Sequence, residues 1–127
     1  MLQKEILERE KKNYNKIYLY IDAESNLCYA YDFSACIVTK LFDVQNTGIK
    51  EVSGIETPVY TLQLPLQFVV EQFDNFNTLV DDQFIKVIIK QLSRCIQWRV
   101  EFEELKMQQR QRGRAIKERF LGFFRFA

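Results

Sequence analysis

The residue types that most often carry catalysis are scarce in this chain of 127 residues. It contains no histidine, so no imidazole can act as a base near neutral pH, and it has no glycine-rich loop that would bind phosphate. The adjacent acids Asp81 and Asp82 are typical of a solvated turn rather than of a metal site. We therefore expect a protein that is not an enzyme and that uses neither a metal nor another cofactor.

Three cysteines offer the remaining reactive groups, but their pattern argues against chemistry. Cys28, Cys36 and Cys95 are an odd number at wide spacing, which is not a disulfide framework. Without histidine the usual zinc patterns cannot be built, and each cysteine lies among apolar neighbours. The sequence predicts that all three are small buried hydrophobic side chains.

The main clue to a partner is an uneven distribution of charge. Residues 1–104 carry 11 basic and 16 acidic groups, whereas residues 105–127 carry seven basic groups and one acid. Guanidinium groups pair with phosphate oxygens, so this end is a candidate nucleic-acid contact. The alternative is a solvated helix end whose cations suit the helix dipole. The candidate phosphate-binding residues are Lys106, Arg110, Arg112, Arg114, Lys117, Arg119 and Arg125.

Aromatic residues gather in two places, and in both we favour packing over base stacking. The candidate partner-binding residues at the C-terminal end are Phe120, Phe123, Phe124 and Phe126. We expect them to dock on the core or on a partner protein, with stacking on unpaired bases as the alternative. The second place is a tyrosine-rich face, which comprises Tyr18, Tyr20, Tyr29 and Tyr31. We expect these rings to pack against other side chains while their hydroxyl groups contact water.

The first part of the chain changes from helical to extended periodicity and back. Residues 1–12 have the pattern of a short helix. Residues 16–21 and 27–31 alternate in side-chain character, which predicts an antiparallel hairpin around a polar turn. From Asp32 the spacing becomes helical, and the Asp32 carboxylate can cap this helix.

The middle of the chain predicts two or three more strands. Residues 49–52 form a short edge strand or none, and residues 58–64 alternate as a strand with one buried face. Pro65 suits the first position of an amphipathic helix over residues 66–80. Residues 84–90 are short and β-branched, as a central strand buried on both faces would be, and a helix continuing through them is the alternative.

The last predicted element is a long helix over residues 91–120, in which Gly113 permits a break. Its expected inner stripe, with Trp98 beside it, comprises Leu92, Cys95, Ile96, Arg99, Phe102 and Leu105. Alternation of strands and helices predicts an α/β fold: a single domain with a mixed four- to five-stranded sheet, flanked by helices, and a long C-terminal helix.

The domain division follows composition. We expect an N-terminal helix or extension over residues 1–15, an α/β domain over residues 16–105, and a basic, Phe-rich C-terminal tail over residues 106–127. No apolar run is long enough for a transmembrane helix, and the charged N-terminus lacks the apolar core of a signal peptide. A cytoplasmic location is the resulting prediction.

The run Leu27-Cys-Tyr-Ala-Tyr31, followed by Ser34-Ala35, resembles the opening of the N-terminal domain of MutS-type mismatch-repair proteins. In that domain a strand of the form F-Y-E-x-F leads into a helix that begins D-A. The resemblance covers about residues 16–90 in element order. The stand-alone MutS-like accessory protein of diversity-generating retroelements is a closer match, since Tyr29 to Ala35 fits its aromatic and Ser-Ala pattern.

This resemblance implies a function but not mismatch reading. The mismatch-reading Phe and Glu are replaced here by Leu27 and Tyr29. The accessory family implies a reverse transcriptase and its template RNA or cDNA as partners, with no membrane and no small-molecule substrate. The first hypothesis is therefore a nucleic-acid-binding accessory protein of a reverse transcriptase. The alternative is a protein–protein adaptor without nucleic-acid contact.

Overall fold

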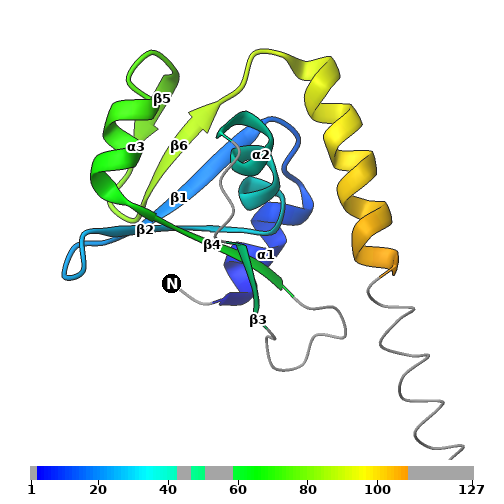
Figure 1. The fold of residues 1–127 in the computed structure, drawn as a ribbon, viewed down its shortest axis with the longest axis horizontal. Helices are drawn as coiled ribbons and strands as arrows, with labels where there is room; N and C mark the ends of the chain where they lie inside the picture. Colours follow the sequence, from blue (N-terminus) through cyan, green and yellow to red (C-terminus); the bar gives the residue numbers. More distant parts are fainter. Residues whose placement is uncertain (1–2, 43–46, 51–58, 109–127) are drawn as a thin grey trace, which may run out of the picture.

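Six strands form one sheet in the order β3-β4-β2-β1-β6-β5, and every neighbouring pair is antiparallel (Figure 1). The computed structural model describes residues 3–42, 47–50 and 59–108, with backbone alone for residues 47–50. The strands are β1 (Lys16–Asp22), β2 (Leu27–Tyr31), β3 (Thr47–Lys50), β4 (Val59–Pro65), β5 (Asn77–Val80) and β6 (Phe84–Ile88). The helices are α1 (Gln3–Lys11), α2 (Asp32–Phe42), α3 (Leu66–Gln72) and a C-terminal helix described over residues 92–108.

The predicted hairpin is confirmed and lies inside the sheet. β1 and β2 pair with Tyr20 opposite Tyr29, and the turn between them ends at Asn26. Asn26 has a φ of 55°, a left-handed conformation that asparagine tolerates better than most residues. Because the strand alternates side chains, this register sends Tyr18 and Tyr20 to one face of the sheet and Ile17 and Leu19 to the other.

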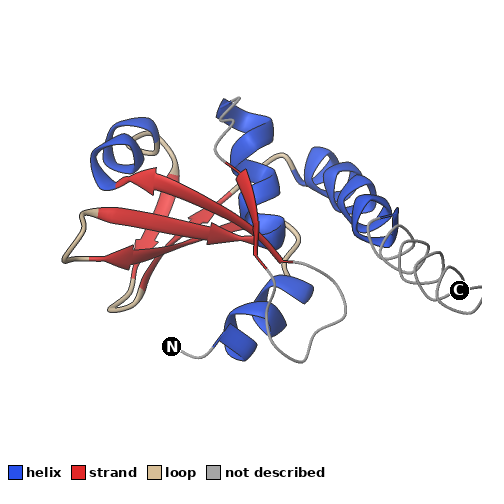
Figure 2. Ribbon diagram, turned by 60° about the horizontal axis from the view of Figure 1, so that its bottom comes forward, coloured by secondary structure: helices blue, strands red, loops and turns tan. Residues whose placement is uncertain are grey.

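The two faces of the sheet are covered differently, and Figure 2 shows α1 and α2 on opposite sides of it. Ile17 and Leu19 belong to the main core beneath α2 and α3, while Tyr18 and Tyr20 pack with Ile6 of α1. The Arg9 guanidinium lies 5.4 Å from the ring centroid of Tyr18 and donates a hydrogen bond of 2.8 Å to the Tyr20 hydroxyl. The tyrosine-rich face therefore packs under a helix.

The predicted fold class is confirmed, with helices against one sheet and a C-terminal helix. Two details of the sheet differ, since it has six strands rather than four or five and is antiparallel rather than mixed. A short strand was one of the two expectations for residues 49–52. The observed strand β3 covers Thr47–Lys50 and so includes the first half of that segment, while residues 51 and 52 lie outside the described residues. β6 is an interior strand between β1 and β5, so a helix through residues 84–90 is excluded. The strand is not buried on both faces as predicted, because it is next to the edge strand β5 and only Val87 among its residues is buried.

The helix predicted over residues 66–80 is wrong in its second half. α3 ends at Gln72, and the chain turns so that the N–H of Phe76 bonds the carbonyl of Phe73 at 3.0 Å. Residues 77–80 then pair with β6 as β5. Amphipathic helical spacing does extend through Phe76, but Asn77 and Thr78 favour turn and strand, and the ladder with β6 decides the outcome.

The N- and C-terminal helices are both parts of this unit. α1 packs against the sheet, and the boundary predicted between residues 105 and 106 falls inside the C-terminal helix. Within the described part of the chain, no helix has the length and apolar character needed to cross a bilayer.

Candidate functional site

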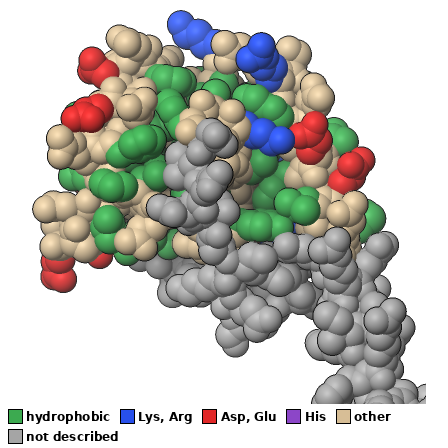
Figure 3. Space-filling view, in the orientation of Figure 1, with side chains coloured by type: hydrophobic (Ala, Val, Ile, Leu, Met, Phe, Trp, Pro, Cys, Tyr) green, Lys and Arg blue, Asp and Glu red, His purple; other side chains and the backbone are tan. Residues whose placement is uncertain are grey.

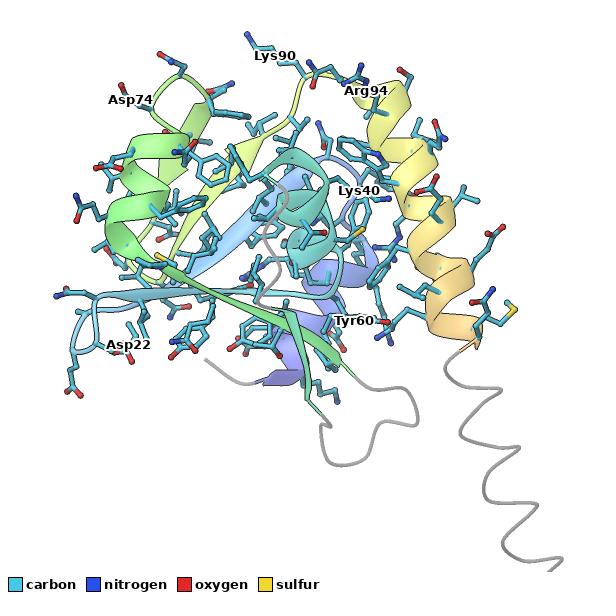
Figure 4. The ribbon with its side chains drawn as sticks, viewed as in Figure 1. Asp22, Lys40, Tyr60, Asp74, Lys90 and Arg94 are labelled. Carbon is cyan, nitrogen blue, oxygen red and sulfur yellow. The ribbon has the colours of Figure 1, made fainter. Side chains whose placement is uncertain are left out.

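The C-terminal helix is fixed to the body along one side. Its buried side chains Cys95 and Phe102 belong to the main core, and the Phe102 ring lies 5.8 Å, centroid to centroid, from the rings of Phe33 and Tyr60. Lys40 of α2, labelled in Figure 4, forms an ion pair of 3.2 Å with Glu101 near the midpoint of the helix. These contacts set which side of the helix faces solvent.

Arg99 ties this helix to the end of α1. Its guanidinium donates hydrogen bonds to the carbonyls of Glu10 at 2.9 Å and Lys11 at 3.2 Å, which are among the last carbonyls of α1. A cation at a helix C-terminus satisfies carbonyls that lack partners within the helix and suits the helix dipole. The same group lies 5.0 Å from the Phe33 ring centroid and pairs with Glu103 at 2.6 Å.

Lys106, a predicted phosphate-binding residue, is occupied within the protein. Its Nζ lies 3.1 Å from Asp32 Oδ1, and the two side chains are only 16% and 13% exposed. The Asp32 carboxylate also accepts the backbone N–H of Tyr60 at 3.1 Å, so it bonds to β4 rather than filling the α2 capping role that we expected. We therefore assign Lys106 to holding the C-terminal helix in place.

The cap of α2 comes from α1 instead. The Glu10 carboxylate accepts the N–H of Ser34 at 2.8 Å and its hydroxyl at 2.6 Å, while the Asn13 amide donates at 3.2 Å. Glu10 is 1% exposed, and burial raises its pKa from 4.5 to about 7, partly offset by these hydrogen bonds. A raised carboxyl pKa often marks a catalytic acid, but this carboxyl is buried and joins α1 to α2.

The solvent side of the C-terminal helix carries an apolar stripe. Its side chains are about half exposed or more: Leu92 at 51%, Ile96 at 50%, Val100 at 54% and Met107 at 61%. Spacings of four, four and seven residues place them along one side of the helix. In Figure 3, hydrophobic side chains reach the surface at this edge of the molecule beside acidic ones. We call these four residues the helix stripe.

The predicted inner side of this helix is partly wrong. Leu92, Ile96 and Leu105 were expected to face the core, but all three are exposed. The signal for the stripe was present, because apolar residues occupy two neighbouring rows of the helix, one through Cys95 and Phe102 and one through Leu92 and Ile96. An apolar arc this wide exceeds what one contact with the body can cover.

The other predicted site residues lie outside the described residues. They are Arg110, Arg112, Arg114, Lys117, Arg119, Arg125, Phe120, Phe123, Phe124 and Phe126. Their roles in nucleic-acid or partner binding stay predictions.

The prediction of buried cysteines is confirmed for Cys28 and Cys95, whereas Cys36 is only partly buried against the core. All three are free thiols. Burial raises the pKa of each thiol, that of Cys36 to about 11, so none is a ready nucleophile. Among residues 3–42 and 59–108, no group of three or more Cys, Asp and Glu side chains is arranged to hold a metal ion.

In comparisons with known proteins, no family model, no curated protein and no solved structure gives a significant match to this chain. The likeness to MutS-type domains therefore stays a prediction.

Proposed function

We propose that this protein is a non-catalytic accessory protein that docks on a partner protein through the helix stripe. The observation that carries the proposal is that Leu92, Ile96, Val100 and Met107 are exposed on a helix whose neighbouring row is held to the body by Phe102, Arg99 and Lys106. A helix with apolar anchors four residues apart is the form in which helices enter apolar grooves of partners.

The geometry presents these anchors in a fixed direction. Three residues of the helix are bound to the body by hydrogen bonds or ion pairs. Arg99 binds α1, Glu101 binds α2, and Lys106 binds the β2–α2 junction. Docking therefore requires little ordering of the helix, which lowers the entropic cost of association.

The resemblance and the charge distribution suggest which protein the partner is. A basic run that contains Arg110, Arg112 and Arg114 begins two residues after the described end of the helix. A partner that binds nucleic acid would bring phosphates close to this run while the stripe contacts protein. The reverse transcriptase of a diversity-generating retroelement binds nucleic acid and also offers a protein surface to the helix stripe. A cytoplasmic location follows from this choice of partner.

The test is co-purification with the reverse transcriptase encoded in the same locus. Full-length wild-type chain and the Ile96→Glu/Val100→Glu variant would each be co-expressed with it, tagged, and recovered after nuclease treatment. We expect the wild type to retain the reverse transcriptase and the variant to lose it, because two charges would be buried without partners.

Gln108→Glu adds a charge at an exposed polar position of the same helix and is the matched control. It should bind as the wild type does. Equal recovery by the stripe variant would remove the helix stripe from the interface. A locus without a reverse transcriptase would overturn the choice of partner.

A further inference from the structure

β5 is an edge strand whose outer side is open among the described residues. It follows β6 at the end of the sheet, at the side opposite the C-terminal helix in Figure 1. All four of its residues are exposed, with Leu79 at 52% and Val80 at 76%. An open edge presents backbone groups that another extended segment can pair with.

The hydrogen-bond register shows which groups point outward. The N–H of Asp81 bonds the carbonyl of Phe84 at 2.8 Å, and hydrogen-bonded pairs alternate along an antiparallel ladder. Leu79 and Asn77 therefore bond to β6. The backbone N–H and C=O groups of Thr78 and Val80 face the open edge. The β1–β6 register agrees with this assignment. The N–H of Ile89 bonds the carbonyl of Asn15, so the odd-numbered residues of β6 bond to β1 and the even-numbered ones bond to β5.

Within the strand, this edge carries no side chain that would block pairing. Exposed edges are commonly guarded by short strand length, lysine, proline or a bulge; Asn77–Val80 is short, with four residues, but contains neither a charge nor a proline. Charge is found at its two ends instead. Asp74 is exposed in the turn before β5, as Figure 4 shows, and Asp81 and Asp82 are exposed in the turn after it.

We propose that the β5 edge binds an extended peptide segment of a partner protein, with apolar side chains at its centre and Lys or Arg at its ends. Backbone hydrogen bonds from Thr78 and Val80 provide the pairing, and exposed apolar side chains on the strand contact the centre of the segment. The acids at both ends of β5 select basic flanks. This surface is separate from the helix stripe, so the two surfaces together would let one molecule bridge two partners.

A second copy of this chain is a poorer occupant. Two-fold antiparallel pairing of β5 with itself would bring Asp81 and Asp82 of each copy beside the turn that carries Asp74 of the other. Like charges at close range oppose such pairing. Charge complementarity therefore favours a basic segment over self-association.

The experiment titrates the full-length protein with two fluorescent octapeptides that share the centre Val-Thr-Val-Thr. One has two Lys at each end and the other has two Glu. Three variants separate backbone pairing from charge. Val80→Pro removes an outward N–H at an edge position that tolerates proline, Val80→Thr retains that N–H, and Asp81→Asn/Asp82→Asn removes acidic charge.

We expect the wild type to bind the Lys-flanked peptide at least about tenfold more tightly than the Glu-flanked one, with weaker binding at high salt. Val80→Pro should abolish binding while Val80→Thr keeps it, and the Asp variant should lose the preference. Thermal unfolding confirms that each variant is folded. Equal binding by Val80→Pro, equal binding of both peptides, or no saturable binding at about 1 mM peptide would overturn the proposal. A wild-type dimer that Val80→Pro dissociates would overturn it in favour of a second copy.

Discussion

Lys106 Nζ lies 3.1 Å from Asp32 Oδ1 in a largely buried ion pair that joins the C-terminal helix to the point where β2 becomes α2. Asp32 adopts a left-handed conformation with a φ of 45°, which costs a non-glycine residue some free energy. Its carboxylate is held there by Lys106 and by the N–H of Tyr60. One side chain therefore fixes the junction, β4 and the helix together.

Breaking this pair should destabilise the fold. We expect Lys106→Ala to lower the free energy of unfolding by about 1–3 kcal/mol, because a largely buried carboxylate would be left without its cation. Asp32→Asn keeps both the acceptor for Tyr60 and the tolerance of positive φ, so it isolates the charge. Urea unfolding of both single variants and the double variant gives the coupling free energy, with the exposed Lys90→Ala as control. A coupling free energy near zero would contradict the structural role of Lys106.

The buried Glu10 carboxyl predicts a pH dependence of stability. Because its pKa is about 7 in the folded protein and 4.5 when solvated, the folded state binds more protons between these values. The contribution of Glu10 is therefore fully present below pH 4.5 and is lost as pH rises through 7. Over this window the free energy of unfolding should fall by about 3 kcal/mol from this group alone.

Glu10→Gln is the variant that tests this expectation. An uncharged amide can still accept the N–H of Ser34, so the fold should persist with a flatter pH profile between pH 5 and 7.5. Denaturant unfolding at several pH values, for wild type and variant, measures the difference. Parallel profiles would mean that Glu10 does not titrate in this range.

The basic run beyond the described helix predicts a salt-dependent contact with nucleic acid. Replacing Arg110, Arg112 and Arg114 with Ala should weaken binding of RNA or single-stranded DNA across sequences. The slope of log affinity against log salt should fall by about two to three, because each phosphate that the variant no longer neutralises lowers it by about 0.7–0.9. Fluorescence anisotropy at two salt concentrations measures the slope. If slope and affinity are unchanged, nucleic acid does not bind at these residues.

Local periodicity was sufficient to predict most of the fold. The alternation around Tyr18 and Tyr20 defined the hairpin, and the β-branched run containing Val87 identified β6. The end of α3 was not predictable in the same way, because Phe73 and Phe76 continue its apolar spacing. Residues 77–80 form strand β5 because their backbone pairs with that of β6. The propensity of the local sequence alone does not determine this pairing.

The functional surfaces were harder to predict than the fold. Lys106 has the sequence position of the first residue in a basic run, and only tertiary structure shows that Asp32, 74 residues earlier in the chain, neutralises it. Leu92 and Ile96 are typical core residues by type, and their exposure depends on which side of the helix Phe102 anchors. Burial of Glu10 was equally hidden, since an acid in a charged helix predicts a solvated side chain.

The proposed function depends on docking of the helix stripe on a partner protein. The most direct measurement is a calorimetric titration of nuclease-treated reverse transcriptase with the full-length chain at low and high salt. We predict an affinity that changes little with salt and falls at least about tenfold in Ile96→Glu/Val100→Glu, with Gln108→Glu unaffected. An affinity that collapses at high salt but is the same for wild type and the stripe variant would contradict docking through the helix stripe.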